Sequence, residues 1–175
     1  AVELDEPEVH SITARMREAL LPLLEEMAPH KPDMVWLAGS PGTEEMVLAA
    51  IQRVLGEGVP VFGGSSADND ISGKWYQFTQ ERWMSNGVVV TLVCASVEIS
   101  GALFSSYSPT SKTGVVTKAE GRNLLELDGR PAAEVYNEWT LKRIAKHMDP
   151  SAPAAERNIL AASSVWPLGR YLGHP

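Results

Sequence analysis

The chain has very little cysteine and few basic residues. Its single cysteine, Cys94, excludes an intrachain disulfide and a zinc site built from cysteines. Because Cys94 stands in the apolar run Val88–Ala95, we expect it to be a small buried residue without a chemical role. The 15 Lys and Arg are outnumbered by 22 Asp and Glu, which gives a net charge of -7. With no Lys/Arg cluster to neutralise phosphates, the chain is not expected to bind nucleic acid.

Long apolar runs are also absent. No run approaches the length of a transmembrane helix, and the first residues, Ala1–Glu6, are acidic where a signal peptide would be basic and then apolar. We therefore expect a cytoplasmic protein that makes no membrane contact and holds no metal. The 175 residues, 44% of them hydrophobic and 21% charged, are typical of one ordinary folded domain with a sizeable core.

The N-terminal segment has a helical pattern. Asp5 as cap and Glu8 as the second half of a capping box predict the helix start, and Pro22 predicts a kink or a division inside it. The apolar residues at helical spacing are Ile12, Met16, Leu20, Leu23, Leu24 and Met27. Pro29–Pro32 ends the helix.

A strand, a helix and a second strand follow. Met34–Ala38 reads as a short buried strand, Gly56 closes an amphipathic helix, and Val59–Phe62 reads as the next strand. The strands of such a βαβ unit are usually parallel neighbours, so the loops Gly39–Thr43 and Gly63–Asp70 should lie side by side at one edge of the sheet.

After the glycine loop, apolar and polar residues alternate with a period of two, which is typical of strands. A hairpin is predicted at Ser85–Gly87, a central strand at Val88–Ala95 and a further strand of the same meander at Val97–Tyr107. Two short strands, Val115–Lys118 and Leu124–Leu127, precede a helix that opens after Pro131 and turns Val135, Trp139 and Ile144 inward. We predict a mixed α/β fold: a layered mixed β-sheet with flanking helices, starting helix–strand–helix–strand and continuing as an antiparallel meander.

Several of these segments resemble one known family. In order and spacing, four segments are similar to the N-terminal half of a FIST domain. They are Val61–Ala67, the strand Gly87–Val90, Val116–Asn123 and Glu126–Ala132, the last of which contains the run Asp-Gly-Arg-Pro-Ala. The Asp-Gly-Arg-Pro-Ala run is the most specific piece. One departure is Asp68-Asn69, where many members have glycine and an acidic residue.

The resemblance implies a domain organisation and partners. It implies a FIST N-terminal-like domain over 1–148, a linker over 149–157 and, over 158–175, the start of a truncated FIST C-terminal-like half whose first strand lies in Asn158–Arg170. It also implies a sensory module of intracellular signal transduction that recognises a small molecule such as an amino acid and is not an enzyme. The partners would be the FIST C-terminal half and a downstream signalling protein.

The glycine loop is the predicted binding site, because glycines let a ligand approach the backbone while hydroxyls and carboxylates supply polar contacts. Backbone N–H groups and the two serine hydroxyls would receive a carboxylate, Asp68 would receive an ammonium group, and Ser40 would close the site. Trp75 and Tyr76 are candidate walls, and Arg122 and Arg130 are weaker candidates for an anion. The predicted ligand-binding residues are Ser40, Gly63, Gly64, Ser65, Ser66, Asp68 and Asn69. The alternative for each is a structural role: turn residues that cap their own backbone, and aromatic residues of the core.

Two other classes stay open. A haem-binding sensor of nitric oxide, as found among similar proteins, would need an axial histidine, for which His147 is the best placed. A serine hydrolase would need Ser65 or Ser66 beside a base, yet the chain has no Gly-x-Ser-x-Gly elbow. A third possibility is a structural half that binds only its C-terminal partner.

Overall fold

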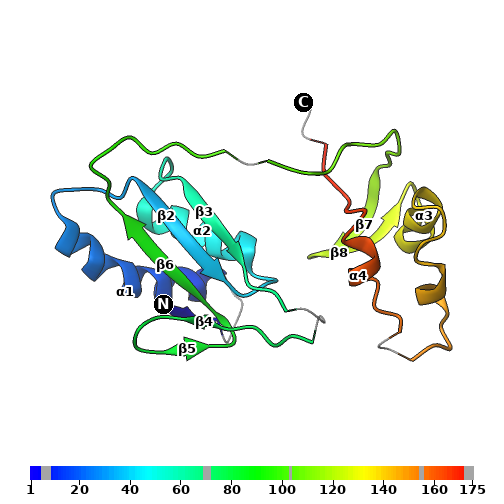
Figure 1. Ribbon diagram of the computed structural model, residues 1–175, viewed down its shortest axis with the longest axis horizontal. Helices are drawn as coiled ribbons and strands as arrows, with labels where there is room; N and C mark the ends of the chain where they lie inside the picture. The colour runs from blue at the N-terminus through cyan, green and yellow to red at the C-terminus, as the bar shows by residue number, and fades with distance from the viewer. Residues whose placement is uncertain (5–8, 69–71, 103, 154–155, 172–175) are drawn as a thin grey trace. The chain divides into compact units, whose positions relative to one another are not determined.

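A computed structural model describes residues 1–4, 9–68, 72–102, 104–153 and 156–171 (Figure 1). The fold is mixed α/β, which confirms the predicted class. The chain divides into two compact units, Ala1–Leu103 and Phe104–Pro175, which are described separately. The predicted domain ranges 1–148, 149–157 and 158–175 are not tested by this division and stay predictions.

The first unit is built on a four-stranded sheet with the strand order β1-β6-β2-β3. Its elements are β1 (Val2–Glu3), α1 (Val9–Met27), β2 (Met34–Gly39), α2 (Glu44–Leu55), β3 (Val61–Ser65), β4 (Gln77–Phe78), β5 (Trp83–Met84) and β6 (Gly87–Val93). Strands β2 and β3 are parallel, whereas β6 runs antiparallel to both of its neighbours, β1 and β2. The predicted βαβ unit and the central position of the Val88 strand are therefore confirmed.

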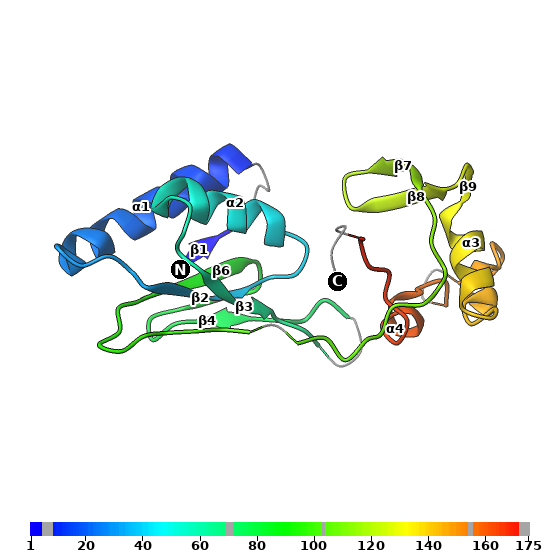
Figure 2. The ribbon, with the colours of Figure 1, turned by 90° about the horizontal axis from the view of Figure 1, so that it is seen from above.

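Both helices of the first unit cover the same face of the sheet (Figure 2). The predicted apolar stripe of α1 is buried as far as Leu20, but Leu23 is 40% exposed because the last turns of α1 extend past the sheet (Figure 1). Pro22 lies inside one continuous helix, so the predicted division is wrong. The predicted capping residues Asp5 and Glu8 lie outside the described residues.

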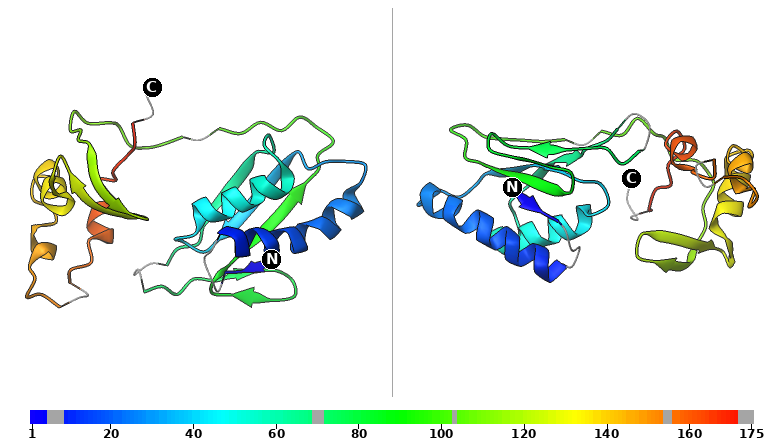
Figure 3. Two further views of the ribbon diagram at one scale, coloured as in Figure 1. Left: turned by 180° about the vertical axis from the view of Figure 1, so that it is seen from behind. Right: turned by 90° about the horizontal axis from the view of Figure 1, so that it is seen from below.

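The opposite face of the sheet carries no helix among the described residues of the first unit. Trp36 of β2 stands on it between Phe62 of β3 and Thr91 of β6, and Trp36 is 55% exposed. The segment that follows β6 passes on this side of the sheet (Figures 2 and 3). Since two of the three strand pairs are antiparallel, one face of such a sheet can be left without a helix.

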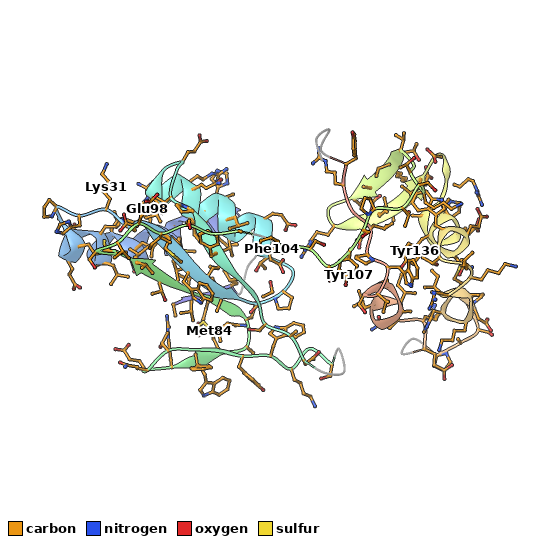
Figure 4. The ribbon with its side chains drawn as sticks, turned by 45° about the horizontal axis from the view of Figure 1, so that its top comes forward. Lys31, Met84, Glu98, Phe104, Tyr107 and Tyr136 are labelled. Atoms are coloured by element: carbon orange, nitrogen blue, oxygen red, sulfur yellow. The ribbon has the colours of Figure 1, made fainter. Side chains whose placement is uncertain are left out.

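Two strand predictions in this unit are wrong. Ser85 and Asn86 join strands of different sheets, while the hairpin of β4 and β5 turns at Thr79–Arg82 through a 2.8 Å bond from the Thr79 N–H to the Arg82 carbonyl. The described residues of Val97–Tyr107 form no strand, because alternation alone does not supply a neighbouring strand to pair with. Met84 is buried between the β4–β5 hairpin and the sheet (Figure 4).

Cys94 is exposed, which corrects its predicted burial. It follows Val93, the last residue of β6, and so lies outside the part of the strand that neighbouring strands flank. Its thiol donates to the Lys31 carbonyl at 3.1 Å.

The second unit places one helix against a three-stranded antiparallel sheet with the order β7-β8-β9. Its described elements are β7 (Val116–Glu120), β8 (Asn123–Leu127), β9 (Arg130–Pro131), α3 (Ala132–Trp139), the 3-10 helix η1 (Ala145–Met148) and α4 (Leu160–Ser163). Leu127, Ala132 and Val135 form its small core. The two predicted strands and the helix after Pro131 are confirmed.

The predicted strand in Asn158–Arg170 is wrong, since this segment contains the short helix α4. Asn158 accepts a 2.9 Å bond from the Leu160 N–H, and an asparagine in that position favours a helical turn.

Candidate functional site

The predicted site lies where β2 and β3 end together. Gly39 pairs with Ser65 in the parallel register, and the Ser66 N–H donates to the Gly39 carbonyl at 2.8 Å. The loops that follow Gly39 and Ser65 therefore lie side by side at one edge of the sheet, as the sequence predicts. The boundary differs, however, because Gly63, Gly64 and Ser65 belong to β3 and not to the loop.

The two glycines of β3 have different structural roles. Gly63 has φ +135°, and a Cβ atom on it would lie 1.8 Å from the Leu37 carbonyl oxygen of the neighbouring strand. Only glycine fits this close approach of two backbones. A Cβ on Gly64 would meet nothing within 4 Å. Gly64 is exposed, so this position leaves the backbone open to another molecule.

Ser65 is held by a carboxylate that the sequence analysis did not include. Its hydroxyl donates to Oε1 of Glu44 at 2.6 Å, while Oε2 of Glu44 accepts the Gly42 N–H at 2.9 Å. Glu44 is the first residue of α2, so the helix start carries the carboxylate to the end of β3. A negative charge beside Ser65 disfavours a ligand carboxylate at that hydroxyl and favours an ammonium group.

Ser40 and Ser66 meet at a shared glutamine. Ser40 is 3% exposed, and its Oγ accepts the Gly87 N–H at 2.8 Å. In the amide orientation that satisfies every neighbour, the nitrogen of Gln77 donates to Ser40 Oγ at 3.0 Å and its oxygen accepts the Ser66 hydroxyl at 3.0 Å. Gln77 is 2% exposed, so this network ties β4 to the ends of β2 and β3 and Ser40 serves the packing of the strand ends.

Asp68 is engaged by its own loop. Its Oδ2 accepts the backbone N–H groups of Gly73 at 2.7 Å and Lys74 at 3.1 Å, together with the Ser72 hydroxyl at 3.2 Å. This arrangement is typical of a carboxylate that shapes a turn. Asn69, the last predicted site residue, lies outside the described residues.

The aromatic candidates do not form a closed wall. Trp75 is half-buried, whereas Tyr76 is 55% exposed and packs edge-on against Trp83 with ring centroids 5.3 Å apart.

Arg130 has a structural partner in the second unit. Its guanidinium donates from Nη1 to Oε2 of Glu138 at 3.0 Å and from Nη2 to Oε1, which links β9 to the last turn of α3. The hydrogen bond from Arg130 lowers the pKa of Glu138, and the same bond raises the pKa of Arg130. Both side chains are about half exposed, at 48% and 57%. Arg130 therefore has a structural role, in which it holds β9 to α3 through Glu138.

The histidine considered for haem sits in η1. His147 Nδ1 lies 2.6 Å from the Glu156 carbonyl oxygen. Within the described ranges no three His, Cys, Asp or Glu side chains gather closely enough to hold a metal ion. No helix formed by the described residues combines the length and apolarity that crossing a membrane requires.

Comparison with known proteins identifies the family. An uncharacterized protein, MJ1623 of Methanocaldococcus jannaschii, is 31% identical over 107 residues, which are 61% of this chain and 20% of that protein. The chain thus spans about a fifth of the length of this relative. No solved structure matches the chain significantly. The FIST N domain family, which is associated with sensory signal transduction, matches residues 1–130, and the chain belongs to it.

Proposed function

We propose that this chain is the ligand-binding part of a sensory signalling protein, and that it takes up a small amine, in the first place an amino acid, beside Ser65. The observation that carries the proposal is the 2.6 Å bond between the Ser65 hydroxyl and the Glu44 carboxylate at the edge where both parallel strands end. Ligands of open α/β sheets bind at such an edge. The proposal makes the chain a binding module and not an enzyme.

The chemistry of this edge matches an amino acid. Glu44 supplies the negative charge that an ammonium group needs, and Ser65 Oγ supplies a neighbouring oxygen. The Ser66 N–H bonds to β2, and alternate residues of a strand direct their backbone groups to opposite sides, so the Ser65 N–H points away from β2. That N–H is a donor for the ligand carboxylate. Gly64, which has no side chain in the way, leaves room for the approach.

The assignment of groups changes from the one that the sequence suggests. The sequence analysis gives the carboxylate to the serine hydroxyls and the ammonium group to Asp68. With Glu44 bonded to Ser65 and Asp68 turned into its own loop, the ammonium group belongs at Glu44.

The proposal extends to partners and location. A FIST C-terminal half and a downstream signalling protein complete the sensor, and this chain supplies the module that detects the ligand. The module acts in the cytoplasm, which is consistent with a chain that has one cysteine and forms no internal disulfide.

A thermal-shift screen of the purified chain tests the proposal. The panel contains the amino acids, simple organic acids, simple amines and haemin, because a ligand that binds only the folded state raises the unfolding midpoint by mass action. We expect a saturable rise with one or more amino acids and none with acids that lack an amine. Replacing Ser65 by alanine should weaken binding about tenfold, the loss expected for a hydrogen bond to a charged group.

A second pair of a serine and a carboxylate provides the control. Ser151 donates to Asp149 at 2.6 Å in the second unit, so Ser151→Ala removes a similar bond away from the site. This variant should keep the full ligand response. An equal loss in Ser151→Ala and Ser65→Ala, or a response to organic acids alone, would refute the proposed site. A response to haemin alone, with a Soret band, would favour the haem sensor.

A further inference from the structure

The outer edge of β3 is a row of backbone groups that no strand of the described chain covers, since the sheet order ends at β3. The Val35 N–H donates to the Pro60 carbonyl at 2.9 Å and the Ser66 N–H to the Gly39 carbonyl at 2.8 Å. Even-numbered residues of β3 therefore face β2. By alternation, the N–H and C=O groups of Val61, Gly63 and Ser65 point outward.

This edge lacks the usual protection of an edge strand. Natural proteins guard such edges with charged side chains, proline, bulges or a covering segment. Strand β3 has the sequence Val-Phe-Gly-Gly-Ser, which contains neither a charge nor a proline. An exposed row of this kind is a docking site for an extended strand.

A segment of the same chain already lies against β3. A Cβ atom placed on Gly101 would come within 2.2 Å of the Phe62 ring, so Gly101 packs directly on that ring. An aromatic ring that covers a glycine is a contact found between neighbouring strands, where it compensates for the missing side chain. Ile99–Ala102 contains no charge and no proline, and only one residue of it, Ile99, is half-buried.

The chain before this segment is fixed at the correct end of the sheet. The Ala95 N–H donates to Oδ2 of Asp33 at 2.8 Å, which holds the chain beside the start of β2. The distance from the start of β2 to a strand position on the outer side of β3 is two strand spacings, or about 10 Å. The four residues from Ala95 to Ile99 can span about 13 Å. The segment would then run in the same direction as β3.

We propose that the outer edge of β3 is a strand-docking site and that its occupant is Ile99–Ala102, added parallel to β3 as a fifth strand of the main sheet. The order becomes β1-β6-β2-β3 followed by Ile99–Ala102. The added strand covers the outward groups of Val61 and Gly63 and leaves those of Ser65 free. Docking therefore stiffens β3 next to Ser65 without filling the proposed ligand site, and it does not depend on that site being correct.

Amide hydrogen exchange measured by NMR on the whole chain tests this docking. In a parallel edge strand only every second N–H faces its neighbour. We expect two alternate amides of Ile99–Ala102, together with those of Val61 and Gly63, to exchange at least about tenfold more slowly than in an unstructured peptide. Random-coil exchange at all four residues, or protection of β3 that rises with protein concentration, would overturn the proposal; the second result would mean that another copy docks there.

Proline variants sharpen the test. Ile99→Pro and Ser100→Pro each remove one N–H, and only one of these N–H groups faces β3. One variant should abolish the slow exchange of Val61 and Gly63, whereas the other should reduce it less. Ser106→Pro, farther along the irregular segment, is the control and should change nothing at β3. Equal effects of all three variants would overturn the proposal.

Gly101→Ala adds a readout that needs no proline. The new Cβ would overlap the Phe62 ring and push the segment away, so the amides of Val61 and Gly63 should exchange about tenfold faster while the rest of the unit stays folded. Unchanged exchange at β3 in this variant would also contradict the docking.

Discussion

Ser65, the last residue of β3, donates a 2.6 Å hydrogen bond to Oε1 of Glu44, the first residue of α2. The bond joins the end of a strand to the start of the helix that precedes it in the chain. Glu44 also accepts the Gly42 N–H, so one carboxylate fixes the β2–α2 loop and the end of β3 together. A ligand that competes for this carboxylate would weaken the hydrogen bonds that hold the β2–α2 loop and the end of β3. Ligand binding would thereby change the backbone at both places.

Glu44→Gln should therefore differ from Glu45→Gln. Both variants remove a negative charge from the first turn of α2, where it stabilises the helix end, but only Glu44 bonds to Ser65. We expect Glu44→Gln to lower the free energy of unfolding by about 1 kcal/mol more than Glu45→Gln, because a charge-assisted bond becomes a neutral one. Urea denaturation of the two variants measures the difference. A Glu44→Gln variant as stable as the wild type would mean that the Ser65 contact contributes no stability.

Gly63→Ala should be strongly destabilising, and Gly64→Ala should not. At Gly63 the new Cβ would lie 1.8 Å from the Leu37 carbonyl oxygen at a φ of +135°, which costs more than about 2 kcal/mol. At Gly64 nothing lies within 4 Å, so the change should stay within about 1 kcal/mol. Chemical denaturation of the two single variants checks this. Similar stabilities would contradict the close approach of β3 to β2.

Gly63 and Gly64 also show which features of the fold can be predicted from the sequence. The run after Phe62 correctly predicts an edge where two parallel strands end, because a strand–helix–strand pattern leaves few other topologies. It does not show that Gly63, Gly64 and Ser65 continue the strand, since turn-forming residues adopt strand geometry when a neighbouring strand supplies the hydrogen bonds.

Side-chain partners are harder to predict than elements. Glu44 is easily recognised as a helix-start residue, but its contact with Ser65 depends on where β3 ends beside α2. Ser40 is recognised as a polar residue after a strand, yet its burial depends on β4, which lies 37 residues farther along at Gln77. The alternating segment after Cys94 predicts a strand, but alternation carries no information on a pairing partner, and its described residues form no strand.

Ser40→Ala should destabilise the fold more than Ser66→Ala. Ser40 is buried, and its Oγ accepts the Gly87 N–H, so its removal leaves that N–H without its acceptor, while the Gln77 nitrogen keeps the Met84 and Gly87 carbonyls. The expected cost is about 1–3 kcal/mol. Ser66 is half-buried and its hydroxyl gives one bond to Gln77, so its loss should cost about 1 kcal/mol or less. Urea denaturation ranks the two, and the opposite order would mean that the Gln77 network does not hold the strand ends.

The Arg130–Glu138 pair should make the second unit sensitive to acid. The bond from Arg130 lowers the pKa of Glu138 below its ordinary value of 4.5. A carboxylate with a lowered pKa in the folded state contributes stability above its unfolded pKa and loses that contribution as pH falls through the folded value. The contribution of this pair is thus fully present at neutral pH and fades below about pH 4.5.

Carbon-detected NMR titration of Glu138 measures this pKa directly. Arg130→Gln should raise it toward 4.5, because the variant removes the hydrogen-bond donor and the positive charge that favour the ionised carboxylate. Arg122→Gln is the matched control, since Arg122 precedes β8 and the charged group that shifts the Glu138 pKa is Arg130. Because both members of the pair are largely exposed, added salt should shrink the difference between wild type and Arg130→Gln. A Glu138 pKa that is the same in all three proteins would show that the Arg130 bond does not form in solution.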